Sequence, residues 1–201
     1  MPREVDRVIK TALKSHKSPQ GNISPARPSI ALAVQVAFDT SLPQQDILDL
    51  TWDQYSQGGL TVRQKKERGD KGLWLLLGKE TQQMLDVANR THVHIIVNEE
   101  TAQKYAGKDS FGKVFRKARK WAGIERNLTF QDLRTTALTI MGDSSATTAE
   151  IVAFSGHKFN SPVLETYVKP GREAAIRGRL KRDNSDLAKG DKRGTKGDKE
   201  N

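Results

Sequence analysis

The sequence contains no cysteine among its 201 residues. Disulfide bonds, thiolate nucleophiles and zinc sites built on cysteine are therefore excluded, and the absence fits a reducing compartment. Long apolar runs are missing as well. No stretch approaches the roughly eighteen consecutive apolar residues that a membrane-spanning helix needs, so we expect no membrane segment. The N-terminal segment also lacks the apolar run of a secretion signal, and we expect a cytoplasmic protein.

Apolar residues are scarce overall, at 35% of the chain with a mean hydropathy of −0.66. Much of this deficit lies at the two ends. Residues 1–28 form a polar N-terminal segment, and residues 183–201 carry charges and glycines with almost no apolar side chain. Residues 183–201 cannot bury enough surface to offset the entropy of ordering, so we predict a disordered basic tail. Residues 29–182 are expected to form one domain with its own core.

Basic residues outnumber acidic ones, with 34 Lys and Arg against 24 Asp and Glu, which gives a net charge of +10. Such a balance favours a polyanionic partner, with nucleic acid first. One predicted helix is rich in cations over residues 113–120. Its candidates for contact with a DNA backbone are Lys113, Arg116, Lys117 and Lys120, with Arg119 on the same helix. The alternative is that these side chains form an ordinary solvated helix face.

Apolar periodicity predicts a mostly helical α+β domain with a small antiparallel sheet. The expected helices cover residues 5–13, 29–40, 44–52, 79–90 and 110–124, followed by three short helices across 130–168. The expected strands cover residues 60–64, 73–77 and 94–97, the first two joined by the charged turn KKERGDKG. In the helix at 29–40, apolar residues such as Ile30, Val34 and Phe38 fit one face.

Candidate functional residues gather between Gln131 and residue 168. Arg134, the pair Gly156-His157 and Tyr167 are spaced over the predicted short helices. An arginine, a histidine and a tyrosine brought together can hold a phosphodiester and attack it. The tyrosine hydroxyl needs no metal for this attack once cations stabilise the phosphate oxygens. This pattern indicates phosphodiester chemistry, and it calls for no cofactor and no metal ion.

Four segments resemble, in the same order, the motifs of the catalytic domain of tyrosine recombinases (phage integrases). The first is FDTSLPQQDILDLTW, which resembles the family's T-G-x-R-x-x-D/E-I/L-L-x-L-x-W box. The second is VRQKKERGDKGLWLLL, which resembles its V-x-Q-x-K-T-G hairpin. The last two are LTFQDLRTTALT and FSGHKFNSPVLETYV, which resemble L-T-x-H-D-L-R-x-T-A and the G-H-S…Y segment. The resemblance covers roughly residues 29–170 and implies the α+β catalytic fold of that family.

The resemblance implies a role for each matching residue. Tyr167 would attack the scissile phosphate, forming a 3′-phosphotyrosyl link and releasing a 5′-hydroxyl. Arg134 would grip the non-bridging oxygens, for which a planar guanidinium suits bidentate contact. His157 would hydrogen-bond the same phosphate, and Lys66 would be the general acid for the departing 5′-oxygen. DNA is then the partner, and the family's behaviour allows a homo-oligomer on DNA.

Two positions depart from the family pattern. The family's first arginine falls on Pro43, and the histidine that opens the HxLR box falls on Gln131. Because losing one transition-state donor commonly costs on the order of 10²–10³ in rate, two functions stay open. The first is a recombinase that cuts and rejoins DNA through Tyr167. The second is a catalytically impaired descendant that acts as a DNA-binding regulatory or accessory protein. An RNA- or ribosome-associated role has little support, since the chain has no aromatic RNP-like box and no GXXG loop.

Each candidate also has a simpler structural interpretation. Tyr167 could be an amphipathic residue at the edge of the core, and Arg134 could form a salt bridge with Asp132. Lys66 shares its predicted turn with other lysines, and most hairpin lysines are solvated. Pro43 suits the first turn of a helix that begins at Gln44.

Overall fold

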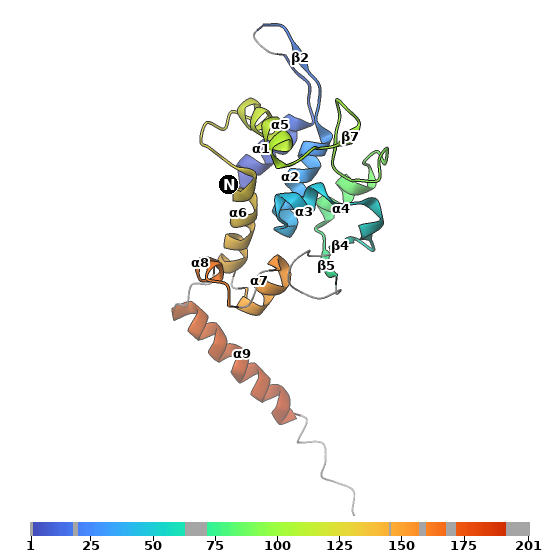
Figure 1. Ribbon diagram of the computed structural model, residues 1–201. Helices are drawn as coiled ribbons and strands as arrows, with labels where there is room; N and C mark the ends of the chain where they lie inside the picture. The colour runs from blue at the N-terminus through green and yellow to red at the C-terminus, as the bar shows by residue number, and fades with distance from the viewer. Residues whose placement is uncertain are drawn as a thin grey trace, which may run out of the picture.

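A mostly helical domain with three small antiparallel sheets is seen in a computed structural model, which describes residues 2–17, 20–62, 72–144, 146–156, 160–167 and 172–191 (Figure 1). The fold class expected from the sequence is thereby confirmed. The helices are α1 (Pro2–Ala12), α2 (Pro28–Thr40), α3 (Gln44–Leu48), η1 (Trp52–Gln54, a 3-10 turn), α4 (Lys79–Asp86), α5 (Lys108–Trp121), α6 (Phe130–Asp143), α7 (Thr148–Ser155), α8 (Val163–Tyr167) and α9 (Arg172–Asp191). The strands are β1 (His16–Lys17), β2 (Ile23–Ser24), β3 (Tyr55–Ser56), β4 (Gly59–Val62), β5 (Leu73–Leu76), β6 (Val97–Asn98) and β7 (Gln103–Lys104).

Helix α2 is the centre of the core. It packs against α1, α3, α4, α5 and α6, and it is buried on nearly every side. The expectation of a single apolar face is therefore wrong for this helix. Ala31, Leu32 and Val36, which fall outside the expected face, are each at most 4% exposed. Small residues such as alanine let the surrounding helices approach α2 from all directions, as expected for a helix that is apolar all round.

The central sheet has the strand order β3-β4-β5, with Leu60 opposite Leu75 and Thr61 opposite Trp74. The strands predicted at 60–64 and 73–77 are confirmed where the structure describes them, as β4 up to Val62 and as β5, while residues 63–71 with most of the charged turn lie outside the described part. The helix predicted over 44–52 ends early, at Leu48. Its continuation pairs with another segment instead: Leu50 accepts a hydrogen bond from the Ile95 amide at 2.9 Å, and the Trp52 amide donates to Val93 at 3.1 Å.

The same pairing changes the strand expected over 94–97. Only an isolated bridge joins His94 to Thr51, and the true strand begins at Val97, where β6 pairs with β7. Ile95 and Ile96 are nevertheless buried, as the apolar pattern indicates. The short apolar run at 94–97 therefore predicts burial correctly. Long-range backbone pairing decides which of its residues form a strand.

The two polar ends expected from the sequence contain helices. Helix α1 puts Val5, Val8 and Ala12 into the same core as α2. Helix α9 runs to Asp191, so residues 183–191 are helical where the sequence predicts a disordered tail, and residues 192–201 lie outside the described part. Among the described residues, no helix is both long and apolar enough to cross a membrane.

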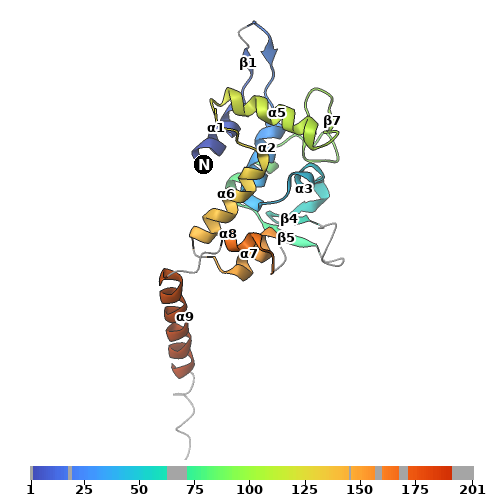
Figure 2. The same cartoon turned by 60° about the vertical axis from the view of Figure 1, so that its left-hand side comes forward.

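An aromatic cluster ties α6 to α5. Phe130, the first residue of α6, meets the rings of Phe111 and Phe115 edge-on, at centroid distances of 5.0 and 5.4 Å. This arrangement suits the quadrupoles of the rings and adds direction to apolar burial. Helix α6 then runs from α5 toward α7 and α8. In both views α5 lies at one end of the body, and α7 and α8 lie together at the other end (Figures 1 and 2).

Candidate active site

Helix α6 presents Arg134 one turn after its start. Thr129 caps the helix, and its amide donates a 2.7 Å hydrogen bond to the carboxylate of Asp132. This capping box satisfies one of the amides that a helix start leaves without a partner. The carboxylate of Asp132 thus has a structural task at the helix end. The cap sets where the helix begins and so fixes the direction in which Arg134 points.

The Arg134 guanidinium connects three elements. Its Nη1 donates to the carbonyl oxygen of Ser41, just after α2, and its Nη2 donates to the carbonyl of Ser155 at 3.0 Å, at the end of α7. A planar guanidinium can make several such bonds at fixed angles, which a lysine cannot do. Arg134 therefore fastens the ends of α2 and α7 to α6, and no sequence pattern indicates this structural task.

Tyr167 lies near this guanidinium. Burial lowers the pKa of Arg134 from its usual value, while the charge of Asp46 acts in the opposite direction. An arginine stays protonated in a protein even with such a shift. Helix α8 packs against α6, and Tyr167 shares an apolar cluster with Leu138 of α6. The structure therefore brings together two of the residues predicted for catalysis, from helices α6 and α8.

Helix α2 ends beside Arg134 in a left-handed turn. Ser41 has φ 55°, a conformation that favours glycine, and its amide donates back to Ala37 at 3.0 Å. The family motif has glycine at this position, and the structure shows the physical reason for that choice. The buried hydroxyl of Ser41 has no hydrogen-bond partner among the described residues.

Pro43 and Gln131 take different places. Pro43 is half-buried and precedes α3, so it occupies the capping position of a helix that begins at Gln44, as expected. The Ile47 amide donates to its carbonyl at 3.1 Å. Gln131 is exposed on the first turn of α6. Lys66 and His157 lie outside the described residues, so their predicted roles stay predictions.

The residue before His157 ends helix α7. Thr147 and Glu150 form a capping box at the start of α7, and Gly156 ends it in the left-handed conformation with φ 70°. The Gly156 amide donates to Val152 at 3.0 Å. Glycine adopts this conformation without steric cost, which explains why a glycine stands there. The chain leaves α7 at the point where Ser155 binds Arg134.

Tyr167 is the last residue of α8 and is 8% exposed. It packs in a small cluster with Leu138, Ile151 and Leu164, separate from the main core. The approach of α8 to α6 depends on Gly142. A β-carbon built on Gly142 would lie 1.9 Å from the carbonyl oxygen of Tyr167, far inside van der Waals contact. Gly142 therefore allows α8 to bring Tyr167 close to α6.

We expect Gly142→Ala to displace Tyr167 without changing any predicted catalytic side chain. The obstructing atom belongs to the backbone, so α8 itself must shift, and overpacking of this kind commonly costs about 1–3 kcal/mol of stability. A misplacement of about 1 Å can cost on the order of 10² in rate. Thermal unfolding and the rate of covalent DNA attachment measure the two effects. In Gly178→Ala, the added methyl meets nothing within 4 Å, and it should leave both quantities near their original values or raise stability slightly.

The cationic helix α5 lies away from this site, at the other end of the body (Figure 2). Lys113, Arg116, Lys117 and Lys120 are exposed, as a contact with a phosphate backbone requires. Arg119 is buried and binds Asn127 Oδ1 at 2.8 Å and the Leu128 carbonyl at 3.0 Å. Arg119 therefore stabilises the segment that follows α5, and its side chain is not free to contact DNA.

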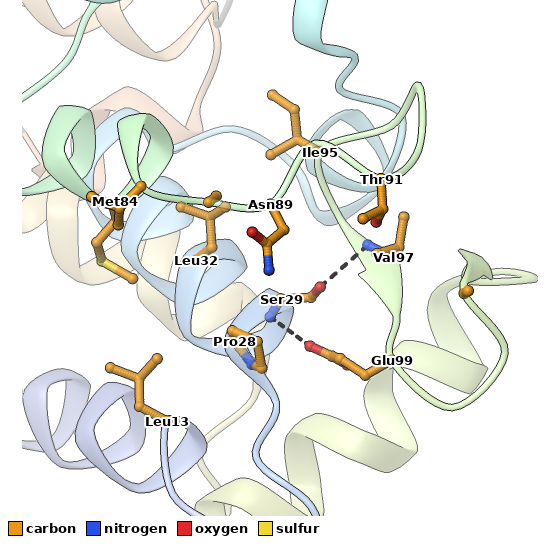
Figure 3. A pocket seen from close by; sticks show the side chains of 13 residues that line it. Leu13, Pro28, Ser29, Leu32, Met84, Asn89, Thr91, Ile95, Val97 and Glu99 are labelled. Carbon is orange, nitrogen blue, oxygen red and sulfur yellow. Dashed lines mark hydrogen bonds between the residues drawn. The ribbon is translucent and has the colours of Figure 1, made fainter.

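A cavity of about 470 Å³ lies at the start of α2 (Figure 3), whereas Arg134 binds the carbonyl of Ser41 at the end of that helix. Its walls are mainly apolar, and include Leu32, Met84 and Ile95. At the edge of the cavity, the carboxylate of Glu99 accepts a 2.7 Å hydrogen bond from the Ser29 amide. This carboxylate therefore satisfies a backbone amide at the start of α2. Within the described part of the chain, no group of three His, Asp or Glu side chains is placed to hold a metal ion.

Sequence reasoning missed Ser41, Ser155 and Gly142. Ser41 and Ser155 act through backbone carbonyls, and a carbonyl carries no residue-specific signal. A glycine inside an apolar helix was the only available hint of Gly142, since such a glycine often marks a close approach. All three positions support Arg134 or Tyr167 rather than a separate centre.

Known proteins share this fold. The model of the phage integrase family matches residues 2–173. The crystal structure of XerA recombinase superposes with a TM-score of 0.64 at 17% identity, over 90% of this chain and 62% of that one. A lambda integrase dimer bound to a COC′ core site gives a TM-score of 0.62 at 19% identity, over 83% of this chain and 46% of that one. The lambda integrase catalytic core gives a TM-score of 0.55 at 17% identity, over 76% of this chain and 92% of that one.

The chain thus spans less than two thirds of the XerA structure and about half of the lambda integrase structure, but nearly all of the isolated lambda catalytic core. No curated protein sequence gives a match. The family model covers most of the chain, including both Arg134 and Tyr167. This chain therefore belongs to the phage integrase family.

Proposed function

We propose that this protein is a DNA-binding tyrosine recombinase that cleaves and rejoins DNA through a phosphotyrosyl intermediate. The observation that supports this most is the packing of α8, which ends at Tyr167, against α6, which carries Arg134. Membership of the phage integrase family adds the chemical precedent.

The reaction follows from these residues. The Tyr167 oxygen attacks the phosphorus, and the bond from phosphorus to the 5′-oxygen breaks. The phenol releases its proton to solvent, and Lys66 as general acid protonates the departing 5′-oxygen and is then reprotonated from solvent. Arg134 and His157 stabilise the charge that develops on the non-bridging oxygens. Attack by a 5′-hydroxyl on the phosphotyrosine reverses these steps and rejoins the strand, so the phosphodiester energy is conserved and no cofactor is consumed.

DNA is the proposed partner, with phosphate contacts from the exposed cations Lys113, Arg116, Lys117 and Lys120 of α5. The lambda integrase structure is a dimer on a core site, and we propose that this chain likewise assembles as a homo-oligomer on DNA. The cytoplasm is the proposed location, since that is where an enzyme of this kind meets chromosomal or phage DNA.

Pro43 sets an expectation for the rate. Proline offers the phosphate no positive charge at the position where the family motif has its first arginine. Because one lost transition-state donor costs on the order of 10²–10³, cleavage by the natural chain should be slow. Pro43→Arg combined with Gln131→His should accelerate it.

The test is a suicide-substrate assay with the full chain and nicked duplex DNA, in which cleavage traps the protein on the DNA. We expect a covalent adduct that survives denaturing electrophoresis, with the DNA attached to the peptide that contains Tyr167. An adduct from the Pro43→Arg/Gln131→His variant alone would show that the natural chain has lost cleavage and would overturn the proposal. The absence of an adduct from both proteins would overturn it as well.

A further inference from the structure

The β1–β2 hairpin projects from the end of the body where α1 and α5 lie (Figures 1 and 2). Its base is closed by a 2.6 Å hydrogen bond from the Arg27 amide to the Ala12 carbonyl. The Arg27 side chain is buried and pairs with Glu99 and Glu100. A two-stranded hairpin is only marginally stable alone, so these contacts at its base are what hold it in place.

The two faces of the hairpin differ. His16 is paired with Ser24, and its ring stacks on Trp121 of α5 with centroids 4.7 Å apart and planes at 18°. Its Nε2 also lies 2.7 Å from the Thr11 carbonyl. Successive side chains of a strand point to opposite faces, so the next pair, Lys17 and Ile23, points away from the body. Both are exposed, Ile23 at 73%.

The segment that forms the hairpin carries charge of one sign. No acidic residue occurs from residue 7 to residue 38, a stretch that includes Lys14 and Lys17. On α5, Lys113 and Lys117 are spaced by one turn in a row that ends at Trp121, where His16 stacks. The exposed cations of α5 and those of the hairpin therefore lie on connected surface.

We propose that the β1–β2 hairpin is a DNA-contacting element that extends the cationic surface of α5 along a duplex. This inference rests on the proposed function, because it assumes that the chain binds duplex DNA. The major groove of B-DNA admits a two-stranded ribbon. Lys14 and Lys17 contact phosphates, and Ile23 lies against the apolar methyl groups of thymines. The hairpin lies at the end of the body away from α7 and α8, so these three residues contribute to binding rather than to the chemical step.

The test measures binding of a fluorescent 30-base-pair duplex by the full chain over a series of salt concentrations. The variant Lys14→Ala/Lys17→Ala should bind about tenfold more weakly, and the slope of log Kd against log salt should fall by about 1.8, because each phosphate contact contributes about 0.9. Ile23→Ser removes no charge, so it should weaken binding while leaving the slope unchanged. At saturating DNA, each variant should form the covalent adduct at the rate of the unaltered chain.

The matched control is Lys79→Ala/Lys181→Ala, which removes the same charge from exposed positions on α4 and α9. This variant should keep the original slope. Binding of duplex DNA by the hairpin variant with unchanged affinity and slope would overturn the inference and leave the proposed function standing. Weakened binding of duplex RNA without any loss on duplex DNA would overturn it too. Failure of the unaltered chain to bind duplex DNA would remove the proposed function itself.

Discussion

Tyr167→Phe is expected to abolish the covalent protein–DNA adduct completely. The substitution removes only the phenol oxygen, which is the proposed nucleophile, and keeps the ring that packs against Leu138, Ile151 and Leu164. Because the packed volume is almost unchanged, the free energy of unfolding should change by less than about 1.5 kcal/mol. DNA affinity should stay near that of the unaltered chain. Denaturing electrophoresis of the nicked-substrate reaction measures the adduct, and thermal unfolding measures the stability.

The chain offers a matched control for this prediction, because it has three tyrosines. Tyr105 is 3% exposed, and burial raises its pKa, with Glu99 adding to the effect. A phenol held neutral in this way is a poor nucleophile at neutral pH. Tyr105→Phe should therefore leave the adduct intact. Adduct formation by Tyr167→Phe at the original rate would assign the nucleophile to another residue and refute the mechanism.

The helical part of the fold and the helices that carry Arg134 and Tyr167 could be predicted from the sequence, because apolar spacing and motif order are local signals. The strands at Leu60 and Leu75 and the helices that carry Arg134 and Tyr167 were found in this way. The features that the local sequence pattern does not predict depend on contacts with residues far away in the sequence. The end of α3 at Leu48, for example, follows from pairing with a segment some 45 residues away.

The candidate site shows the same limit. Motifs predict a catalytic role for Arg134, yet they do not show that it holds the carbonyls of Ser41 and Ser155. They also do not show that Gly142 permits the approach of Tyr167. Local pattern gives no sign of the β1–β2 hairpin, because two residues per strand leave no periodic signal. Its position depends on the stack of His16 against a helix a hundred residues later.

Arg134→Ala is expected to lower the rate of cleavage by a factor of at least about 10²–10³ and to destabilise the fold at the same time. The rate falls because a bidentate cation no longer meets the developing phosphate charge, and one transition-state donor alone is worth about this factor. Stability falls because the carbonyls of Ser41 and Ser155 lose their donor, at a cost of about 1–3 kcal/mol for a buried unsatisfied group. Arg134→Lys should keep a charge and recover only part of either effect, since an ammonium cannot bridge both carbonyls.

The two contributions of Arg134 can be separated by comparison with Arg119→Ala. Arg119 is also a buried arginine that binds a backbone carbonyl, that of Leu128, but it lies on α5, away from Arg134. Its removal should lower the thermal unfolding temperature by a similar amount, while the adduct forms at the original rate below that temperature. If both variants lost cleavage only in proportion to the unfolded fraction, Arg134 would be a structural residue alone. A rate deficit confined to Arg134→Ala, measured where both variants are folded, is what a phosphate-binding arginine requires.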